Sequence, residues 1–339
     1  MVLHGMAGLA ACRFINRQKF GVLIFHHFRE PDLPYLKAIC GHLASRFEPM
    51  PLSAIVNSIE NQTALPSNAI TVTVDDGYRD FLVHGHPIFH KYGIPTTVFV
   101  VAGFADGRLW LWHDQINHAL LNTSRKSIRL ALGHRSVEFD LSTDQSRAKA
   151  FYTLCEELKA VPNDLRLNVL AQLGKIKDIE IPPEPPANWA ALNWGELRAL
   201  ASLDVEIGCH TDSHPILSRL ANWRDLDREI RGAKKLIEEK IGKPVRHFAY
   251  PNGRFIDIGP AAIRSVREAG YRSAVTCDWG LNSLKVEQLQ IRRIPLNFDT
   301  EFRYAVESLA GLHLRINGSA DFVRSCRKSK TDSCLHIHQ

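Results

Sequence analysis

Seven short apolar runs, separated by segments with helical periodicity, constrain the fold of this chain most strongly. The runs are rich in Val, Ile and Phe and almost continuously apolar, which is typical of strands buried on both faces of a parallel sheet. They span residues 21–26, 69–74, 96–101, 205–209, 246–250, 272–277 and 290–294. Helical patterns lie between them, at residues 33–46, 53–61, 79–92, 225–241 and 260–269. This alternation predicts an α/β fold, either open or closed into a barrel.

One long segment, at about residues 103–194, interrupts the alternation. It contains no convincing strand but several helical patterns, and a proline-rich run at 181–186 predicts a stiff connector near its end. We interpret it as a helical insertion between two barrel strands, with a separate small domain as the alternative. In a barrel, the insertion would wall the active site, which lies at the C-terminal ends of the strands.

The remaining domain boundaries follow from the limits of the pattern. Residues 1–19 are predicted to form an N-terminal extension, residues 20–310 the α/β domain, and residues 311–339 a basic tail. The tail is interpreted as solvated, with contact to an anionic glycan or a membrane surface as alternatives. No nucleic-acid-binding motif occurs, so nucleic acid is not an expected partner.

Composition indicates an ordinary globular protein and gives a first expectation for its location. The 339 residues are 45% hydrophobic and carry a net charge of +6, and the seven cysteines form no CxxC pair. An odd number of widely spaced cysteines favours a reducing compartment. The apolar patch at residues 6–12 is too short for a convincing signal peptide, and no run is long enough to cross a bilayer. We expect a cytoplasmic protein, with association at the inner face of the membrane as an alternative.

Two adjacent carboxylates follow the run at residues 69–74, in the sequence Asp75-Asp76-Gly77. Carboxylates side by side at the end of a buried strand repel each other unless a cation offsets their charge. The same three residues also make an ordinary turn, so this motif alone leaves both interpretations open.

Two histidines follow the run at residues 205–209, in the sequence His210-Thr-Asp-Ser-His214. Imidazoles four residues apart can face one ion if the backbone turns helically. Cys209 precedes the first histidine, but alternation along the strand directs its side chain elsewhere, so we interpret it as a buried structural thiol.

A third motif runs from Arg246 through Pro251-Asn252-Gly253. An arginine that opens an apolar strand is costly to bury without a carboxylate partner. The Pro-Asn-Gly sequence predicts a sharp turn with exposed backbone N–H groups.

Together, these three motifs resemble the polysaccharide deacetylase family (carbohydrate esterase family four, which includes nodulation chitooligosaccharide deacetylases). The resemblance covers about residues 20–298, with the insertion poorly matched. It implies a distorted TIM-like (β/α)7 barrel. It also implies a hydrolase that removes N-acetyl groups from an amino sugar in an exopolysaccharide, a cell-wall glycan or a glycan precursor.

The resemblance also implies roles for individual residues. Asp75 corresponds to the catalytic base, and Asp76, His210 and His214 correspond to the ligands of a divalent metal, with Zn²⁺ as the expected ion. One carboxylate and two imidazoles leave coordination positions open, as in catalytic rather than structural zinc sites. A metal there would lower the pKa of a bound water and polarise the acetamide carbonyl.

Three further assignments follow from the resemblance. Arg246 would orient Asp75 and keep it ionised, and the backbone N–H of Asn252 would bind the developing oxyanion. The family's histidine near the last strand is missing from residues 290–296. Some members carry their acid histidine at the N-terminus, as if the barrel were permuted, so His26 is predicted to protonate the leaving amine. His27 is the alternative acid, and a core or capping histidine is the non-catalytic interpretation.

Several alternatives stay open at this point. Trp110 and Trp112, at the start of the insertion, could stack on sugar rings or anchor the insertion to the barrel. A related barrel amidohydrolase, acting on formyl groups or cyclic amides, is a rival function, and a catalytically silent glycan-binding module is another. The substrate could be a secreted polysaccharide, peptidoglycan, a lipid-linked precursor or a nucleotide sugar.

Overall fold

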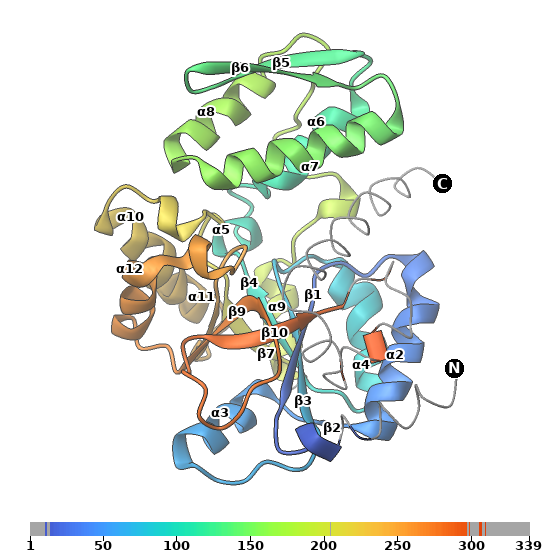
Figure 1. Cartoon of the computed structure of the whole chain (residues 1–339), viewed down its shortest axis with the longest axis vertical. Helices are drawn as coiled ribbons and strands as arrows, with labels where there is room; N and C mark the ends of the chain where they lie inside the picture. Colours follow the sequence, from blue (N-terminus) through green and yellow to red (C-terminus); the bar gives the residue numbers. More distant parts are fainter. Residues whose placement is uncertain are drawn as a thin grey trace.

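The computed structural model describes residues 11, 14–203, 205–296, 298, 305, 306 and 309. Seven parallel strands form a closed barrel in the order β1-β10-β9-β8-β7-β4-β3, and β1 closes it by pairing with β3 (Figure 1). The strands are β1 (Gly21–Phe25), β3 (Ala69–Val74), β4 (Thr96–Val100), β7 (Glu206–Cys209), β8 (His247–Ala249), β9 (Ser273–Trp279) and β10 (Ile291–Pro295). The predicted strands and the distorted (β/α)7 barrel are therefore confirmed. A two-residue strand, β2 (Glu48–Pro49), pairs with the N-terminal end of β3.

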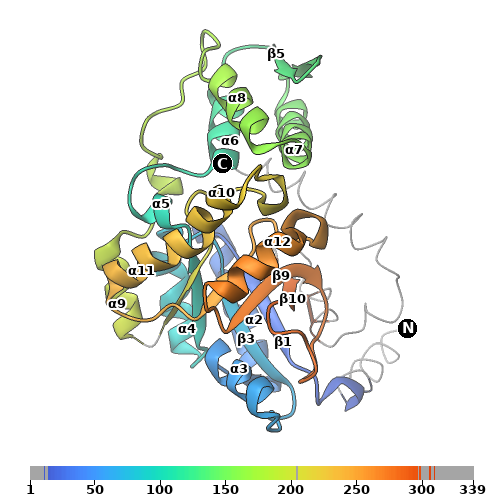
Figure 2. The same ribbon diagram turned by 90° about the vertical axis from the view of Figure 1, so that its left-hand side faces the viewer.

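Helices cover the outside of the barrel in both ribbon views (Figures 1 and 2). They are α2 (Leu33–Arg46), α4 (His86–Lys91), α9 (Trp194–Ser202), α10 (Trp223–Asp227), α11 (Ala233–Ile241) and α12 (Phe255–Glu268), while α3 (Leu52–Asn61) lies at the N-terminal end of the barrel. The predicted helices are present, but two of them contain a π-helical turn, at Phe81–Gly85 and at Arg228–Gly232. Helix α12 begins before its predicted start at residue 260, because a kink at Gly259 accommodates Pro260 within it.

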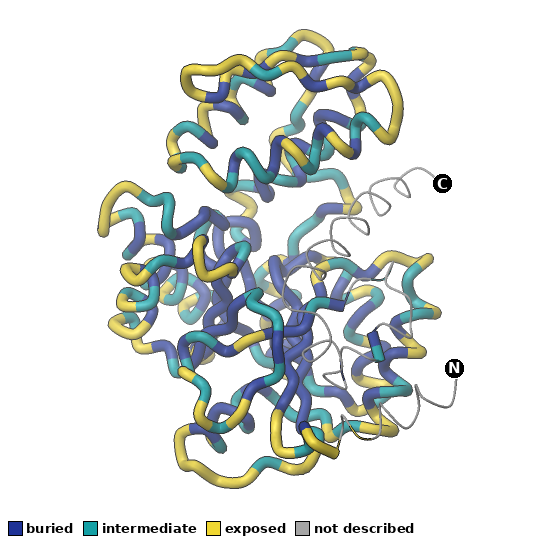
Figure 3. Tube along the Cα trace, in the orientation of Figure 1, coloured by how far each residue is buried: buried dark blue, intermediate teal, exposed yellow. Residues whose placement is uncertain are grey.

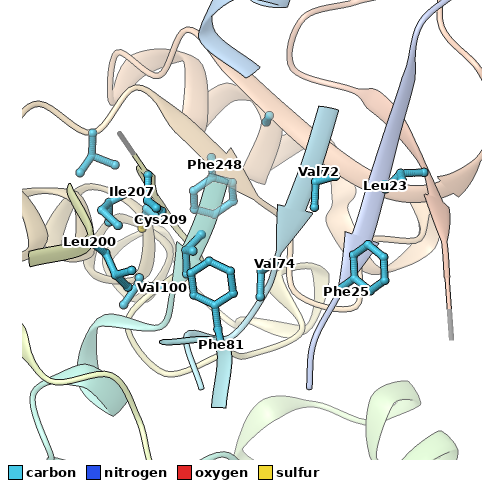
Figure 4. Packing of buried hydrophobic residues seen from close by; sticks show 14 of the residues in the cluster. Leu23, Phe25, Val72, Val74, Phe81, Val100, Leu200, Ile207, Cys209 and Phe248 are labelled. Carbon is cyan, nitrogen blue, oxygen red and sulfur yellow. The ribbon is translucent and has the colours of Figure 1, made fainter. Parts of the chain in front are cut away.

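Alternating strand residues build two hydrophobic layers. Leu23 and Phe25 of β1 and Val72 and Val74 of β3 pack in the layer beneath the surrounding helices (Figure 4). Residues of the opposite register, such as Val22, Phe99 and Ile291, share a second cluster with the buried face of α3, which lies at the N-terminal end of the barrel. The burial map shows the barrel as a continuous buried centre inside exposed loops (Figure 3). Burial of apolar surface in these two layers stabilises the folded state, by about 25 cal/mol for each square ångström removed from water.

The insertion between β4 and β7 lies at the C-terminal end of the barrel (Figure 1). It contains the helices α5 (Ala102–Ala105), α6 (Trp112–Asn122), α7 (Asp144–Ala160) and α8 (Asn163–Leu173) and an antiparallel hairpin, β5 (Ser127–Leu132) and β6 (Arg135–Asp140). A separate hydrophobic cluster, made only of residues between 112 and 181, holds these elements together.

The helices of the insertion agree with the sequence prediction, but the hairpin was not expected, because no convincing strand was found in this segment. Buried residues alternate with more exposed ones along β5, so one face of the hairpin packs on the helices and the other meets solvent. The short alternation was masked by the helical patterns on either side of it.

Two sequence predictions concern parts of the chain that the structure leaves out. Residues 1–10 of the predicted N-terminal extension and the predicted basic tail at 311–339 lie outside the described residues. Among the residues that are described, no helix has the length and apolar character needed to cross a membrane.

Candidate active site and metal centre

The two carboxylates after β3 lie in a tight turn at the C-terminal rim of the barrel. Asp75 and Asp76 are both buried, with 1% and 4% of their surface exposed. Asp76 has a φ of +71° and Gly77 a φ of +81°. The left-handed conformation is unfavourable for a residue with a side chain, so its presence at Asp76 indicates a turn held by its surroundings.

A buried arginine binds both oxygens of Asp75. Nη1 of Arg293 donates to Oδ1 at 2.7 Å and Nη2 donates to Oδ2 at 2.8 Å, while Nε donates to the carbonyl of Thr276 at 2.7 Å. Burial by itself would raise the pKa of Asp75, but the charge and hydrogen bonds of Arg293 outweigh it and hold this pKa below the usual range. Asp75 is therefore ionised, as a general base must be.

The prediction that Arg246 orients Asp75 was wrong. Arg246 is exposed and immediately precedes β8, at the N-terminal end of the barrel, whereas Asp75 follows the C-terminal end of β3. An arginine that opens a parallel strand lies a full strand length from the catalytic rim. Arg293 lies in the middle of β10, and only β1 separates β10 from β3. Its side chain can therefore reach Asp75 at the end of β3.

The two histidines after β7 face Asp76. Nδ1 of His210 lies 2.7 Å from the carbonyl of Ala249, so this nitrogen is the donor and Nε2 carries the lone pair. Nε2 of His210 lies 3.6 Å from Oδ1 of Asp76, and Nε2 of His214 lies 3.5 Å from the same oxygen. The candidate ligand atoms of Asp76, His210 and His214 lie within 4.8 Å of one another, as the sequence predicted for a metal site.

The electrostatics of this cluster fit a bound cation. Oδ1 of Asp76 is buried and has no hydrogen-bond partner in the described part of the chain. Burial, Asp75 and Asp114 together raise the pKa of Asp76 well above its usual value. Burial also lowers the pKa of His214 well below its ordinary value, so its imidazole is neutral and able to bind a metal. A divalent ion would offset the repulsion between the two carboxylates and occupy the unpartnered oxygen.

His26 and His27 follow β1 at the same rim, in different surroundings. His26 is exposed, yet desolvation by the surrounding protein lowers the pKa of its ring to about 4, and the nearby Asp75 carboxylate offsets only part of this. His27 is held from two sides, because its Nδ1 lies 2.8 Å from Oδ2 of Asp80 and its ring stacks on Tyr78 with centroids 3.8 Å apart. Of the two side chains, His26 is the more exposed.

Asn252 lies in the turn after β8, also at this rim. Its φ is +58°, and the N–H of Gly253 donates to the carbonyl of Pro251 at 2.6 Å. A Cβ at Gly253 would lie 2.7 Å from the backbone nitrogen of Cys277, so glycine is required there. The structure thus brings the predicted oxyanion donor to the correct end of the barrel, and the role of its N–H stays a prediction.

The insertion contributes further polar residues to this rim. The Tyr78 hydroxyl donates to Oδ2 of Asp114 at 2.6 Å, and Nε2 of His113 lies 3.4 Å from the same hydroxyl. The His113 ring also lies 5.5 Å from the ring of His214. Burial raises the pKa of Asp114 to about 6. The adjacent sequence His113-Asp114, near the start of the insertion, was the available signal for this contact.

The two tryptophans of the same segment anchor the insertion. Trp110 and Trp112 are only 4% and 5% exposed. Trp110 packs against Trp189, and Trp112 belongs to the hydrophobic cluster of the insertion. Neither presents a free face for stacking on a sugar ring.

Fold and site together define a class: a closed (β/α)7 barrel with a buried Asp–Arg ion pair and a candidate Asp-His-His metal site at its C-terminal rim. Residues 185–274 match the family model for polysaccharide deacetylase, a range that includes both candidate histidine ligands and the turn at Asn252. Over these residues the chain is similar to the polysaccharide deacetylase family, which confirms the predicted resemblance and enzyme class. No curated protein matches the chain in sequence.

Solved structures share the fold. The deacetylase PplD of Streptococcus pyogenes, in complex with acetate, is 14% identical with a TM-score of 0.56, covering 86% of this chain and 98% of its own. A de-N-acetylase from Aggregatibacter actinomycetemcomitans is 16% identical with a TM-score of 0.54, covering 86% and 99%. The BpsB deacetylase domain of Bordetella bronchiseptica is 18% identical with a TM-score of 0.50, covering 82% and 96%. At these identities, the similarity establishes the barrel architecture.

Proposed function

We propose that this protein is a metal-dependent hydrolase that removes the N-acetyl group from an amino sugar in a polysaccharide or glycan precursor. One observation carries the proposal: an ionised, buried carboxylate lies beside a cluster of one carboxylate and two imidazoles. Asp75 serves as the base, and Asp76, His210 and His214 serve as the ligands. A module that only bound glycans would need neither the base nor the ligands.

The metal site fits a divalent cation, and Zn²⁺ suits its two imidazoles and one carboxylate. When bound, the ion supplies Lewis-acid polarisation of the acetamide carbonyl and lowers the pKa of a water molecule. Asp75 accepts the proton of the attacking water, and Arg293 keeps Asp75 ionised between turnovers. The N–H of Asn252 donates to the carbonyl oxygen as negative charge develops on it.

Departure of the amine requires a proton, which we assign to His26. Its ring lies at the rim near Asp75. Desolvation by the surrounding protein lowers the pKa of His26 to about 4, and the negative charge of Asp75 offsets part of this shift. A histidine is suited to this step because small changes in its surroundings move its pKa through the working range.

The names of the similar structures support an acetylated substrate. All three are deacetylases or a de-N-acetylase, and one is in complex with acetate, the second product of the proposed reaction. We therefore propose an N-acetylated glycan as the substrate of this chain.

Acetate release from N-acetylglucosamine oligomers, measured with protein loaded with Zn²⁺, tests the proposal. His210→Ala and His214→Ala are expected to lose both the metal and the acetate release, because two remaining ligands bind poorly. His86→Ala/His90→Ala is the matched control, since these histidines have the same spacing on a helical segment away from the strand ends. Full metal occupancy in His210→Ala/His214→Ala would contradict the assignment.

The same assay separates the rival functions. Release of formate or opening of a cyclic amide, without acetate, would identify a related amidohydrolase. Glycan binding with no product would identify a silent binding module. Comparing acetate release from polysaccharide, peptidoglycan, lipid-linked precursor and nucleotide sugar would then define the substrate class.

A further inference from the structure

A buried carboxylate holds the loop between the two candidate histidine ligands. Oε2 of Glu229 accepts hydrogen bonds from the backbone N–H of Asp212 at 3.0 Å and of Ser213 at 2.8 Å. Its Oε1 accepts from the hydroxyl of Ser213 at 2.6 Å. Glu229 is 2% exposed and lies in the π-helical turn Arg228–Gly232. Both residues that it binds thus lie between His210 and His214.

This loop has a backbone that needs such support. Thr211 has a φ of +71° and His214 a φ of +54°, and neither residue is glycine. Side chains make this left-handed conformation unfavourable, so it persists where surrounding bonds impose it. Successive backbone N–H groups in such a loop form a concave site for an anion, and the Glu229 carboxylate fills that site.

The position of Glu229 in its helical segment also indicates a specific role. Its neighbours on the buried face, Leu226, Ile230 and Ala233, are apolar and belong to the core. A buried carboxylate costs free energy that an apolar residue there would not. No salt bridge to Glu229 exists among the described residues, so its buried charge is offset by the three hydrogen bonds from the loop and by the more distant charge of Arg166. π-Helical turns often mark functional sites, and this one directs the carboxylate toward the loop.

We propose that Glu229 is a positioning residue of the metal centre, which fixes the loop so that His210 and His214 face the same ion. The inference rests on the proposed metal-dependent function and extends it to a residue outside the ligand set. Residues that hold metal ligands in place typically change metal affinity on the order of 10–100-fold when removed.

The test compares Zn²⁺ affinity in Glu229→Ala with that in a matched variant, Glu206→Ala. Glu206 begins β7, the strand whose other end leads to His210. Its carboxylate accepts from the N–H of Ser53 at 3.2 Å and the hydroxyl of Thr97 at 2.8 Å, much as Glu229 accepts from the loop. Both variants should unfold at lower temperature than the wild type. Only Glu229→Ala should weaken Zn²⁺ binding, on the order of 10–100-fold.

Two further variants separate positioning from general destabilisation. Glu229→Gln keeps an oxygen that can accept both N–H groups and should recover most of the affinity. Glu229→Asp keeps the charge but withdraws it by one methylene, so it should bind Zn²⁺ weakly even if Glu229→Ala fails to fold. The visible spectrum of bound Co²⁺ should change in Glu229→Asp and stay unchanged in Glu206→Ala, because it reports the arrangement of the ligands.

The outcomes distinguish this inference from the function on which it rests. Wild-type affinity in folded Glu229→Ala or Glu229→Asp would overturn the role of Glu229 and leave the metal site intact. Equal losses in the Glu229 and Glu206 variants would show a general stability effect and also overturn it. If the wild-type protein binds neither Zn²⁺ nor Co²⁺, the proposed function itself fails, and the inference fails with it.

Discussion

Arg293 and Asp75 form a two-point ion pair at the C-terminal end of the barrel, with N–O distances of 2.7 and 2.8 Å. The Arg293 side chain is fully buried, and that of Asp75 is 2% exposed. Removing one partner of such a pair leaves the other charge buried and uncompensated, which typically costs about 3–5 kcal/mol. The pair therefore affects both the stability of the fold and the protonation of the proposed base.

Arg293→Met should consequently change two measurable properties. In the wild type, the pKa of Asp75 is lower in the folded than in the unfolded protein. The pair therefore stabilises the folded state at pH values above the unfolded pKa, and this stabilisation is lost as the pH falls through the folded pKa. Without Arg293, burial raises the pKa of Asp75, and the acidic limb of the kcat/KM profile should move to higher pH. Denaturant unfolding at neutral pH should show a loss of about 3–5 kcal/mol.

Arg246→Met is the control for this prediction, because Arg246 is exposed at the other end of the barrel. It should leave the pH profile unchanged, and surface substitutions usually alter stability by about 0.5 kcal/mol or less. An equal shift in both variants would mean that Arg293 acts only through the net charge of the protein.

Substitutions of the two neighbouring carboxylates should have different effects. Asp75→Asn should keep the metal and lower kcat on the order of 100-fold or more, the scale of losing a general base. Asp76→Asn should lose metal affinity, because its Oδ1 lies between the two imidazoles. Metal content and single-turnover rates measured on both proteins would test this, and exchanged phenotypes would reverse the two roles.

The barrel could be predicted from the sequence because its signal is local. Each of the seven strands is a separate apolar run, and β3 coincides with its predicted bounds. The cluster of candidate ligands could be predicted for the same reason, since Asp76 lies just beyond the end of one run and His210 directly follows another. Strand ends meet at one rim whatever the details of packing.

Contacts between distant segments could not be predicted in this way. Arg293 pairs with a carboxylate 218 residues earlier in the chain, and its run carries two adjacent arginines of which only one faces the barrel interior. Choosing between Arg293 and Arg246 requires knowing which end of each strand reaches the rim. The contact between Asp114 and Tyr78 likewise depends on how the insertion packs onto the barrel.

Burial of Asp114 predicts a pH dependence of stability in the metal-free protein. The pKa of Asp114 is raised to about 6, so the folded state binds a proton more tightly than the unfolded state. Stability should therefore fall as the pH rises from about 4 to about 6 and remain lower above it, by a total of about 3 kcal/mol. Urea unfolding across this range would measure the fall. Asp114→Asn should reduce it and leave the part that arises from Asp76, whose pKa burial also raises.

Tyr78→Phe tests the source of this effect. The tyrosine hydroxyl stabilises the ionised form of Asp114, so removing it should raise the pKa of Asp114 further and extend the fall in stability beyond pH 6. A pH profile that is identical in Tyr78→Phe and the wild type would show that the hydrogen bond does not control this carboxylate.

The last prediction concerns the acid. An amine leaves poorly unless it is protonated, whereas a phenolate leaves without a proton. His26→Ala should therefore keep the metal and the fold, lose most activity on N-acetylated sugars and retain more activity on an aryl acetate. His27→Ala is the control, because His27 is held by Asp80 and Tyr78 and is expected to contribute to structure. If only His27→Ala loses amidase activity, His27 is the acid. If both single variants and the double variant stay active, the acid must come from the insertion, where His113 lies beside His214.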